Sequence, residues 1–338
     1  MAIILPELLS GSVITSRVRL ARNLKDYPFK VTNVAKAKDI VAKVNRALVK
    51  CDTFNLYYMS NLSSIQLEAM KEGHLISQAL IDNKECGACL INKDKSLSVM
   101  VNEEDVIREQ CFLKGLSLTE AYKKLTVIDD ELSKNLNLAF DDRLGYLTAC
   151  PTNLGTGLRA SVMMFLPALT ESGKINALIR EVADLGLTVR GVYGEGSDAE
   201  GYMYQISNEV TLGVSEYEIL QEVENTVTQI CRAERDEMER IYVKRELKTM
   251  DTARKSYGIL TNAVMLSYSE FLRHIADVKL GAMLGLISFK SDNDIEKIDE
   301  LIVKVRPASL CESFGKRLNR TDRDILRAEV VSAQLKKL

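Results

Sequence analysis

Cys150-Pro-Thr-Asn-Leu-Gly-Thr-Gly-Leu-Arg-Ala160 is the most informative stretch of this chain, because it joins two closely spaced glycines to an arginine. Gly155 and Gly157 permit a close approach of the backbone to a neighbouring group. Arg159 adds a positive charge where the stretch ends. The stretch lacks the Lys-Ser/Thr ending of a P-loop and the three glycines of the dinucleotide fingerprint, so neither of those sites is predicted.

Three other segments combine arginine with glycine or carboxylate: Thr15-Ser-Arg-Val-Arg-Leu-Ala-Arg22, Val101-Asn-Glu-Glu-Asp-Val-Ile-Arg108 and Val189-Arg-Gly-Val-Tyr-Gly-Glu-Gly-Ser197. If the first segment is a strand, Arg17 and Arg19 project to the same face. Two guanidinium groups there repel each other unless an anion lies between them, and their planar forks suit phosphate oxygens. Each segment also has a plainer interpretation: a solvated edge strand for the first, a solvated acidic turn for the second and a hairpin turn for the third.

Together, the four segments contain five arginines that are far apart in the sequence: Arg17, Arg19, Arg108, Arg159 and Arg190. We predict that they converge on one polyanion such as a nucleoside triphosphate. Phosphoryl transfer depends mainly on positioning and on neutralisation of charge, so an arginine set with Mg²⁺ is a sufficient catalyst. A carboxylate of the Glu-Glu-Asp run could act as a general base at the end of a strand.

The composition excludes several classes of protein. The 338 residues suffice for about two domains, and 45 Lys+Arg against 47 Asp+Glu give a formal charge of −2, which does not predict nucleic-acid binding. The N-terminus lacks the pattern of a signal peptide, and the apolar run Leu280–Phe289 is far shorter than the ~20 residues of a membrane span. We expect a soluble, cytoplasmic protein.

The cysteines predict reduced thiols, because there are seven of them, widely scattered, in a chain without an export signal. Cys86-Gly-Ala-Cys89 has the spacing of half a zinc site. However, the chain offers only His74 and His274 as further nitrogen ligands and no second cysteine pair follows, so buried thiols are favoured over zinc.

The order of elements predicts an α+β domain followed by an all-helical one. The expected strands are 98–101, 145–148, 161–165 and 187–190, and the expected helices of the first part are 35–49 and 174–185. Residues 217–248 are almost all helix-forming and are expected to make one long helix, and further helices are expected at 267–284, 294–305 and 321–337.

In order and spacing, the four arginine segments are similar to the signatures of the ATP:guanidino phosphotransferase family, which includes creatine and arginine kinases. The resemblance covers about residues 13–213. Gly73-His-Leu-Ile-Ser77, Arg159-Ala-Ser-Val-Met163 and Gln205-Ile-Ser-Asn208 most resemble the bacterial protein-arginine kinases of that family. The resemblance implies a catalytic domain at 13–235, with an antiparallel sheet flanked by helices, and a smaller helical domain at 236–338 for dimerisation and phosphoarginine binding.

The resemblance also implies the roles of single residues. Glu104 would be the general base, Glu195 the second carboxylate that orients the guanidinium, and Cys150 an auxiliary group. No dedicated metal ligand is expected, because Mg²⁺ would sit on the ATP phosphates. The ATP-binding residues would be Thr15, Ser16, Arg17, Val18, Arg19, His74, Arg108, Arg159, Ala160, Ser161, Val162, Met163, Arg190, Gly191, Val192, Tyr193, Gly194 and Glu195.

A C-terminal motif matches the same branch, where it implies an allosteric phosphoarginine site. Its residues are Arg323, Asp324, Ile325, Leu326, Arg327 and Ala328. On a helix the two arginines would be one turn apart and could grip a phosphate. The alternative is an ordinary helix face on which Asp324 pairs locally.

The implied activity is transfer of the ATP γ-phosphate to arginine side chains of proteins. Such marking would direct proteins to a Clp protease, regulate the stress response and involve an activator protein and a homodimer. The first motif begins at Thr15, which leaves no room for the N-terminal helical domain of phosphagen kinases, so we expect a pocket open to protein arginines.

Two alternatives are a kinase of small guanidino compounds and a non-catalytic nucleotide-binding degradation adaptor. Val106 and Phe165 stand where the family has histidines, and these departures favour the adaptor and would affect turnover and pH dependence. Thr15 replaces the family's serine and preserves a hydroxyl.

Overall fold

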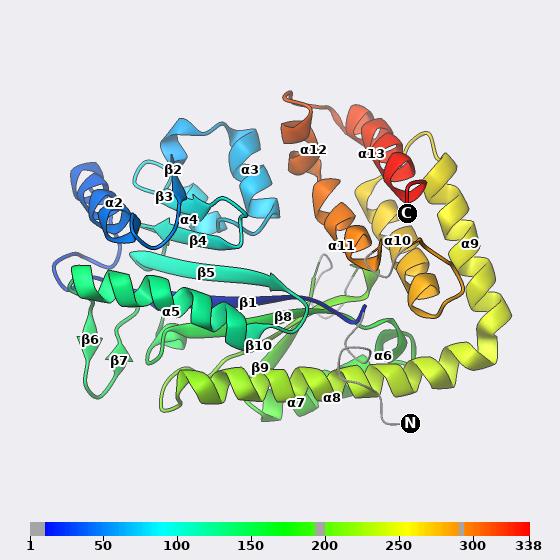
Figure 1. Cartoon of the computed structure of the whole chain (residues 1–338), viewed down its shortest axis with the longest axis horizontal. Coiled ribbons are helices and arrows are strands. Elements are labelled where there is room, and N and C mark those ends of the chain that lie inside the picture. The colour runs from blue at the N-terminus through cyan, green and yellow to red at the C-terminus, as the bar shows by residue number, and fades with distance from the viewer. Residues whose placement is uncertain (1–10, 193–199, 291–293) are drawn as a thin grey trace.

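The computed structural model describes residues 11–192, 200–290 and 294–338. Its centre is an eight-stranded sheet in the order β2-β3-β4-β5-β1-β8-β10-β9, in which every neighbouring pair is antiparallel (Figure 1). The strands are β1 Val13–Arg22, β2 Phe54–Tyr58, β3 Ala88–Asn92, β4 Leu97–Val101, β5 Ile107–Lys114, β8 Leu158–Phe165, β9 Leu187–Gly191 and β10 Met203–Asn208. A separate two-stranded sheet joins β6 Phe140–Asp141 to β7 Gly145–Tyr146.

One face of the large sheet is covered by long helices, and this is where the first core lies. The covering helices are α2 Val34–Leu48, α5 Leu118–Asn135, α7 Ile175–Asp184 and α8 Glu216–Tyr242. Their apolar sides meet strand residues such as Val18 and Leu20, which are at most 1% exposed. On the other face, α3 Ser64–Glu72 and α4 Gln78–Asp82 pack on β3 and β4. The same face of β1 and β8 is therefore left for polar side chains.

The C-terminal part is all-helical and has a core of its own. Its helices are α9 Glu246–Asn262, α10 Tyr268–Met283, α11 Asp294–Lys304, α12 Pro307–Ser313 and α13 Arg320–Leu335. The strands contribute Phe165 and Met203 to this second core, so the sheet and the helical part share buried side chains. The predicted α+β architecture with a helical second part is confirmed.

The remaining short elements are α6 Pro167–Glu171 and the 3₁₀ turns η1 Met59–Asn61, η2 Pro151–Asn153, η3 Glu200–Tyr202 and η4 Val243–Arg245. α8 crosses from one part to the other, and its buried Glu234 accepts hydrogen bonds from the backbone N–H groups of Ala168 and Leu169 at 2.7 and 2.9 Å. These N–H groups have no intrahelical acceptor, because they lie in the first turn of α6. Glu234 thus fixes α6 to α8.

Two expected elements differ from the structure. The strand expected at 145–148 ends at Tyr146, because the backbone N–H of Ala149 turns away to donate to Asp105 at 2.7 Å. The single helix expected at 217–248 is interrupted at η4, where Arg245 has the non-helical dihedrals φ −124° and ψ 23°. The interruption redirects the chain so that α9 packs on α10 and α13 (Figure 1).

Within the described residues, no helix is long and apolar enough to cross a membrane. All seven cysteines are free. Cys86 and Cys89 are buried, and burial raises the pKa of the Cys89 thiol to about 12. No group of three His, Cys, Asp or Glu side chains in the described part of the chain is arranged to hold a metal ion.

Candidate active site

The strand register places four of the predicted arginines on one face of the sheet. Along β1, Arg17 and Arg19 alternate with buried residues. Arg159 lies directly opposite Arg19, and Arg108 lies directly opposite Ala21. Because directly opposed residues of antiparallel strands share a face, all four side chains project to the side that the long helices leave open.

The fifth arginine reaches the same face from the edge strand β9. Arg190 lies opposite Gln205, Gln205 lies opposite Met163, and Met163 lies opposite Thr15. This row continues across β1, β8, β10 and β9, and its side chains share the face of Arg17 and Arg19. The structure therefore brings together all five predicted arginines, which form what we call the arginine face.

The charges of the arginine face act on one another. Burial, followed by the charges of Arg159 and Arg108, lowers the pKa of Arg17 to about 10. Burial, followed by Arg17, Arg108 and Arg159, lowers the pKa of Arg19 well below its usual value. Burial and then Arg190 also lower the pKa of Arg159. Like charges this close are costly unless an anion compensates them.

The hydrogen bonds of the arginine face are incomplete. Arg17 Nη2 lies 3.5 Å from Gln205 Oε1, and Arg159 Nη2 donates to Ser207 Oγ at 3.2 Å. The buried Nε atoms of Arg19 and Arg159 have no hydrogen-bond partner among the described residues. Since buried polar groups are almost always hydrogen-bonded, these donors fit a bound polyphosphate.

The loop between β4 and β5 carries three carboxylates with three different environments. Glu103 has a side chain only 1% exposed and accepts from Arg108 Nη1 at 2.7 Å, from Ser77 Oγ at 2.5 Å and from the Glu104 backbone N–H at 2.9 Å. Glu104 is 48% exposed and its Oε2 lies 3.3 Å from Arg108 Nη2. Glu104 is thus held beside the arginine face with its carboxylate accessible, as a general base requires.

Asp105, the third carboxylate, is a structural anchor that the sequence did not reveal. It is buried and accepts from Asn23 Nδ2 and from the Ala149 backbone N–H, both at 2.7 Å. It thereby fixes the Glu104 loop to the segment that leads into Cys150. Cys150 is half-buried, and its Sγ lies 3.0 Å from Thr152 Oγ1.

The two glycines of the Cys150 stretch make a close approach to the protein itself. Gly155 has φ +109°, and a Cβ there would lie 2.3 Å from Thr211 O. Gly157 has φ +64°, and a Cβ would lie 2.6 Å from Ala21 O. Glycine is required at both positions because the loop rests on neighbouring backbone, and this contact places Arg159 beside β1.

Several predicted ATP-binding residues are not on the arginine face. Ser16, Val18, Ala160 and Val162 have side chains that are fully buried on the opposite face, toward the long helices, so the prediction is corrected for their side chains. The alternation along each strand explains this, since every second residue turns away. Gly191 ends β9, and Val192 packs on the second core. Tyr193, Gly194 and Glu195 lie outside the described residues.

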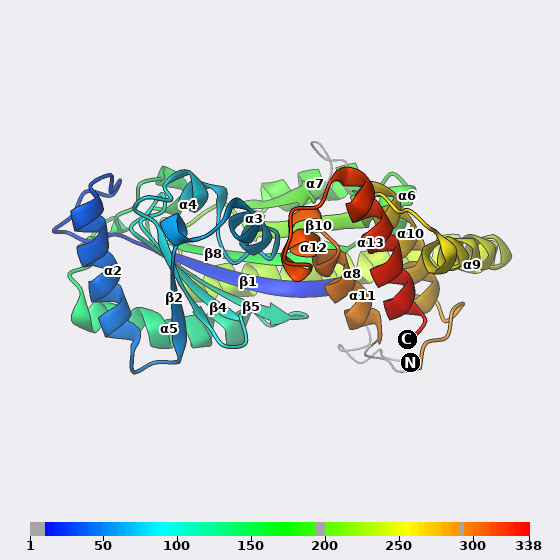
Figure 2. The same ribbon diagram turned by 90° about the horizontal axis from the view of Figure 1, so that it is seen from above.

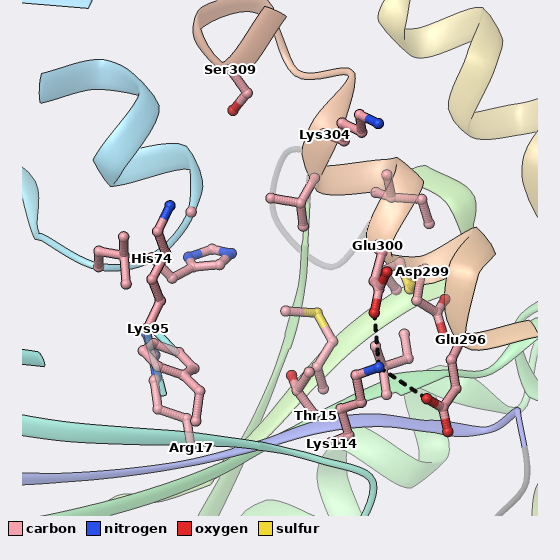
Figure 3. A pocket seen from close by; sticks show the side chains of 18 of the residues that line it. Thr15, Arg17, His74, Lys95, Lys114, Glu296, Asp299, Glu300, Lys304 and Ser309 are labelled. Carbon is pink, nitrogen blue, oxygen red and sulfur yellow. Dashed lines mark hydrogen bonds and ion pairs between the residues drawn. The ribbon is translucent and has the colours of Figure 1, made fainter. Parts of the chain in front are cut away.

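A cavity of about 850 Å³ opens next to the arginine face (Figure 3). It is lined by Thr15, Arg17, His74, Ser161 and Met163 from the predicted ATP site and, across from them, by residues of α11 and α12. Burial, followed by Arg306 and Arg17, lowers the pKa of His74 to about 3, so its imidazole is neutral at physiological pH. A neutral ring suits contact with an uncharged nucleoside.

Residues 36–237 match the sequence model described as ATP:guanido phosphotransferase, C-terminal catalytic domain. The chain belongs to the ATP:guanido phosphotransferase family. Residues 246–338 match the model of the protein-arginine kinase McsB C-terminal domain.

Curated relatives and a solved structure agree with this membership. Two proteins named protein-arginine kinase, from Caldanaerobacter subterraneus subsp. tengcongensis and Clostridium kluyveri, are 43% and 42% identical; each match covers 96% of this chain and 97% or 95% of the relative. The duplicated taurocyamine kinase from Schistosoma mansoni, solved with transition-state analogue components, has 30% identity and a TM-score of 0.61, and the match covers 69% of this chain and 34% of that one.

The two positions at which the resemblance implies histidines are both buried in apolar cores. Val106 is fully buried in the first core, and its backbone N–H donates to Asn23 Oδ1 at 2.8 Å. Phe165 is fully buried in the second core, with Lys279 Nζ 4.8 Å from its ring centre and Tyr202 packed edge-on. Neither side chain is placed to take part in phosphoryl transfer, so these departures do not argue against an active enzyme.

Replacing Val106 by His, the residue that the resemblance implies there, is expected to destabilise the protein by about 2–4 kcal/mol, because two polar ring nitrogens would enter an apolar core. The specific activity of the folded fraction should not rise. Urea denaturation checks the stability, with Val106→Ile as a control that keeps an apolar side chain. Unchanged stability with faster turnover would show that residue 106 faces the site.

The predicted phosphoarginine motif lies on α13, and the structure corrects the expected arrangement of its arginines. Arg327 is 1% exposed and donates to Val305 O at 3.0 Å, to Leu266 O at 2.8 Å and to Asp324 Oδ1 at 2.6 Å. Arg323 is only half-buried and lies 3.5 Å from Leu318 O. The two guanidinium groups therefore do not form an open phosphate clamp, since Arg327 is bound within the helical part. Ile325 and Leu326 are half-buried, and Ala328 is buried.

The donor set fits a magnesium ion carried by the nucleotide. Within the described ranges no cluster of three possible metal ligands exists, and the buried Glu103 is already bound to Arg108. Mg²⁺ commonly binds phosphates, waters and one or two carboxylates. When bound, the ion would neutralise charge on the β and γ phosphates, and the arginine face would hold the remaining phosphate oxygens.

Proposed function

We propose that this protein is an ATP-dependent protein-arginine kinase, which forms ADP and protein phosphoarginine. The observation that carries the proposal is the arginine face, on which five arginines from four strands share one side of the sheet beside the exposed Glu104. Relatives of that name match almost the whole chain. Relatives and geometry thus support the same reaction class.

The triphosphate would lie over the arginine face, with its γ-phosphate at Arg108 and Glu104. A substrate guanidinium has a pKa above ~12 and is no nucleophile until it loses a proton. Glu104 would take that proton while the nitrogen attacks the γ-phosphorus. The N–P bond forms, the P–O bond to ADP breaks, and the arginines neutralise the charge that develops on the leaving ADP. Glu195 would orient the guanidinium as a second carboxylate, and Cys150 would assist.

We further propose a division of labour, with catalysis at 13–235 and dimerisation and phosphoarginine binding at 236–338. The match of residues 246–338 to the C-terminal domain of McsB supports the second assignment. Arg323 and Arg327 would bind phosphoarginine only after Arg327 leaves its buried position. We propose a cytoplasmic enzyme that uses Mg²⁺, is helped by an activator protein, and marks proteins for a Clp protease during stress.

The test compares acceptors under one set of conditions. The protein is incubated with ATP, Mg²⁺ and either an unfolded protein, free arginine or taurocyamine, and acid-labile phosphate on arginine and ADP release are measured. We expect the unfolded protein to have about tenfold or more the kcat/KM of free arginine, because remote contacts add binding energy. Equal use of free arginine would favour a small-molecule guanidino kinase. ATP binding without turnover would favour a nucleotide-binding adaptor.

A further inference from the structure

The geometry of the proposed reaction fixes the direction in which ATP lies on the sheet. Arg108 is opposite Ala21, Arg19 is two residues further along β1, and Arg17 and Thr15 follow toward the helical part. Thr15 and Arg19 are about 13 Å apart along the strand. Since the γ-phosphate must be beside Glu104, the nucleoside must lie at the Thr15 end.

The Thr15 end opens into the cavity whose far wall belongs to the helical part. His74 stands on one side of that cavity, and Glu300 of α11 and Ser309 of α12 stand across from it (Figure 3). Lys114 of β5 pairs with Glu296 and Glu300 of α11 at 3.0 and 2.8 Å. The helical part therefore closes the nucleoside end of the site.

His74 is held in place from the helical part through its neighbour Glu72. α3 ends at Glu72, and His74 follows two residues later with φ +59°, a left-handed conformation that is unusual for histidine. The Glu72 carboxylate accepts from the backbone N–H groups of Ala308 and Ser309 at 2.9 and 2.7 Å and from Ser309 Oγ at 2.8 Å. These groups lie in the first turn of α12, which packs beside α3 (Figure 2).

A second hydrogen bond from the helical part is made to the backbone of Glu72. Arg306, which precedes α12, donates from Nη1 to the carbonyl oxygen of Glu72. Arg306 is 6% exposed and is the charge that contributes most to lowering the pKa of His74 after burial. Glu72 is thus bound through its side chain and through its main chain to one short segment, residues 306–309.

We propose that Glu72 and Arg306 are positioning residues for the nucleoside of ATP, because together they fix the His74 wall of the cavity against α12. The inference rests on the proposed function in taking ATP as the ligand. Neither residue lines the cavity, so both act through His74. The helical part is then needed for nucleotide binding at the nucleoside end, while the γ-phosphate end is formed by residues of the sheet part and its loops.

The contact extends to the helix that carries the predicted phosphoarginine motif. Arg327 of α13 donates to Val305 O, directly before Arg306 in the chain. A ligand that drew Arg327 out of its buried position would remove this support from the segment that holds Glu72. A short series of hydrogen bonds therefore leads from α13 to the proposed ATP site, from Arg327 to Val305 and from residues 306–309 to Glu72.

The test measures nucleotide affinity by calorimetry with the full chain, without turnover. For Glu72→Ala we expect the Kd for MgATP to rise about tenfold, because three hydrogen bonds that fix the wall are lost. The Kd for magnesium tripolyphosphate, which has no nucleoside, should stay unchanged. The KM for ATP should rise with the Kd, and kcat at saturating ATP should stay within about twofold of wild type.

Two further variants sharpen the comparison. Glu68→Ala removes another carboxylate of α3, which is 45% exposed and pairs only locally with Lys71 at 2.5 Å, and it should leave both Kd values unchanged. Glu72→Gln keeps one acceptor oxygen, so its Kd for MgATP should rise less than that of Glu72→Ala. This variant preserves the test if Glu72→Ala does not fold.

Three results would overturn the proposal. They are an unchanged Kd for MgATP in Glu72→Ala (or in Glu72→Gln, if Glu72→Ala does not fold), an equal loss of affinity for MgATP and for magnesium tripolyphosphate in Glu72→Ala, or the same rise in the Kd for MgATP in Glu68→Ala. Failure of the proposed function is distinguishable, because it is detected in the wild type. A wild-type protein that binds MgATP but phosphorylates no arginine contradicts the kinase assignment and leaves the comparison of Kd values valid. A wild type that does not bind MgATP contradicts both.

Discussion

Glu104→Gln is expected to lower the rate of phosphoryl transfer to arginine by about 10³-fold. A glutamine amide cannot take the proton that the substrate guanidinium must lose, whereas Glu104 is accessible for this step, with 48% of its side chain exposed. The amide oxygen can still accept the hydrogen bond of Arg108, so the arginine face keeps its arrangement. The Kd for MgATP should therefore stay within about threefold of wild type.

Single-turnover kinetics with a protein acceptor check this result, because they separate the chemical step from product release. Glu85→Gln is the matched control, since it removes an exposed carboxylate of the same domain that takes no part in the site. Its rate should equal that of the wild type. If Glu104→Gln retained more than about a tenth of the wild-type rate, another group would have to be the base.

The three neighbouring carboxylates show what the sequence could and could not establish. A run of Glu103, Glu104 and Asp105 after a strand indicated a concentration of negative charge, but the run itself did not distinguish its members, and the family resemblance alone assigned the general base to Glu104. In the structure Glu103 is bound to Arg108, Asp105 is bound to Asn23 and Ala149, and Glu104 alone is accessible. Ser77, which also binds Glu103, and Asn23 and Ala149, which bind Asp105, come from distant segments, so the distinction required tertiary structure.

The sequence predicted only part of the arginine face, because the rest depends on how distant strands pair. The period of two along a strand placed Arg17 and Arg19 on one side from the sequence alone. The positions of Arg159 and Arg190 depend on the register between strands, which loop lengths and turns decide. The contact between Glu72 and Arg306 joins residues 234 positions apart. No local pattern predicts such a pair.

Arg19→Met is expected to abolish most activity and to stabilise the nucleotide-free protein. Arg19 lies between Arg17, Arg108 and Arg159, and burial together with these three charges lowers its pKa well below the usual value. Removing it takes away phosphate contacts that matter most in the transition state, so kcat/KM for ATP should fall about 10³-fold. Removing it also relieves repulsion, which should raise the free energy of unfolding by about 1 kcal/mol.

The two effects have opposite signs, and this is what makes the prediction specific. Loss of an ordinary buried side chain lowers activity and stability together, whereas a site built to hold an anion is strained when empty. Calorimetric melting should therefore show a Tm about 2 °C higher for Arg19→Met without nucleotide and a smaller rise on adding MgATP than in the wild type. Arg180→Met, which removes an exposed arginine of α7, should change neither quantity. A lower Tm for Arg19→Met would contradict the idea that repulsion on the arginine face awaits a polyphosphate.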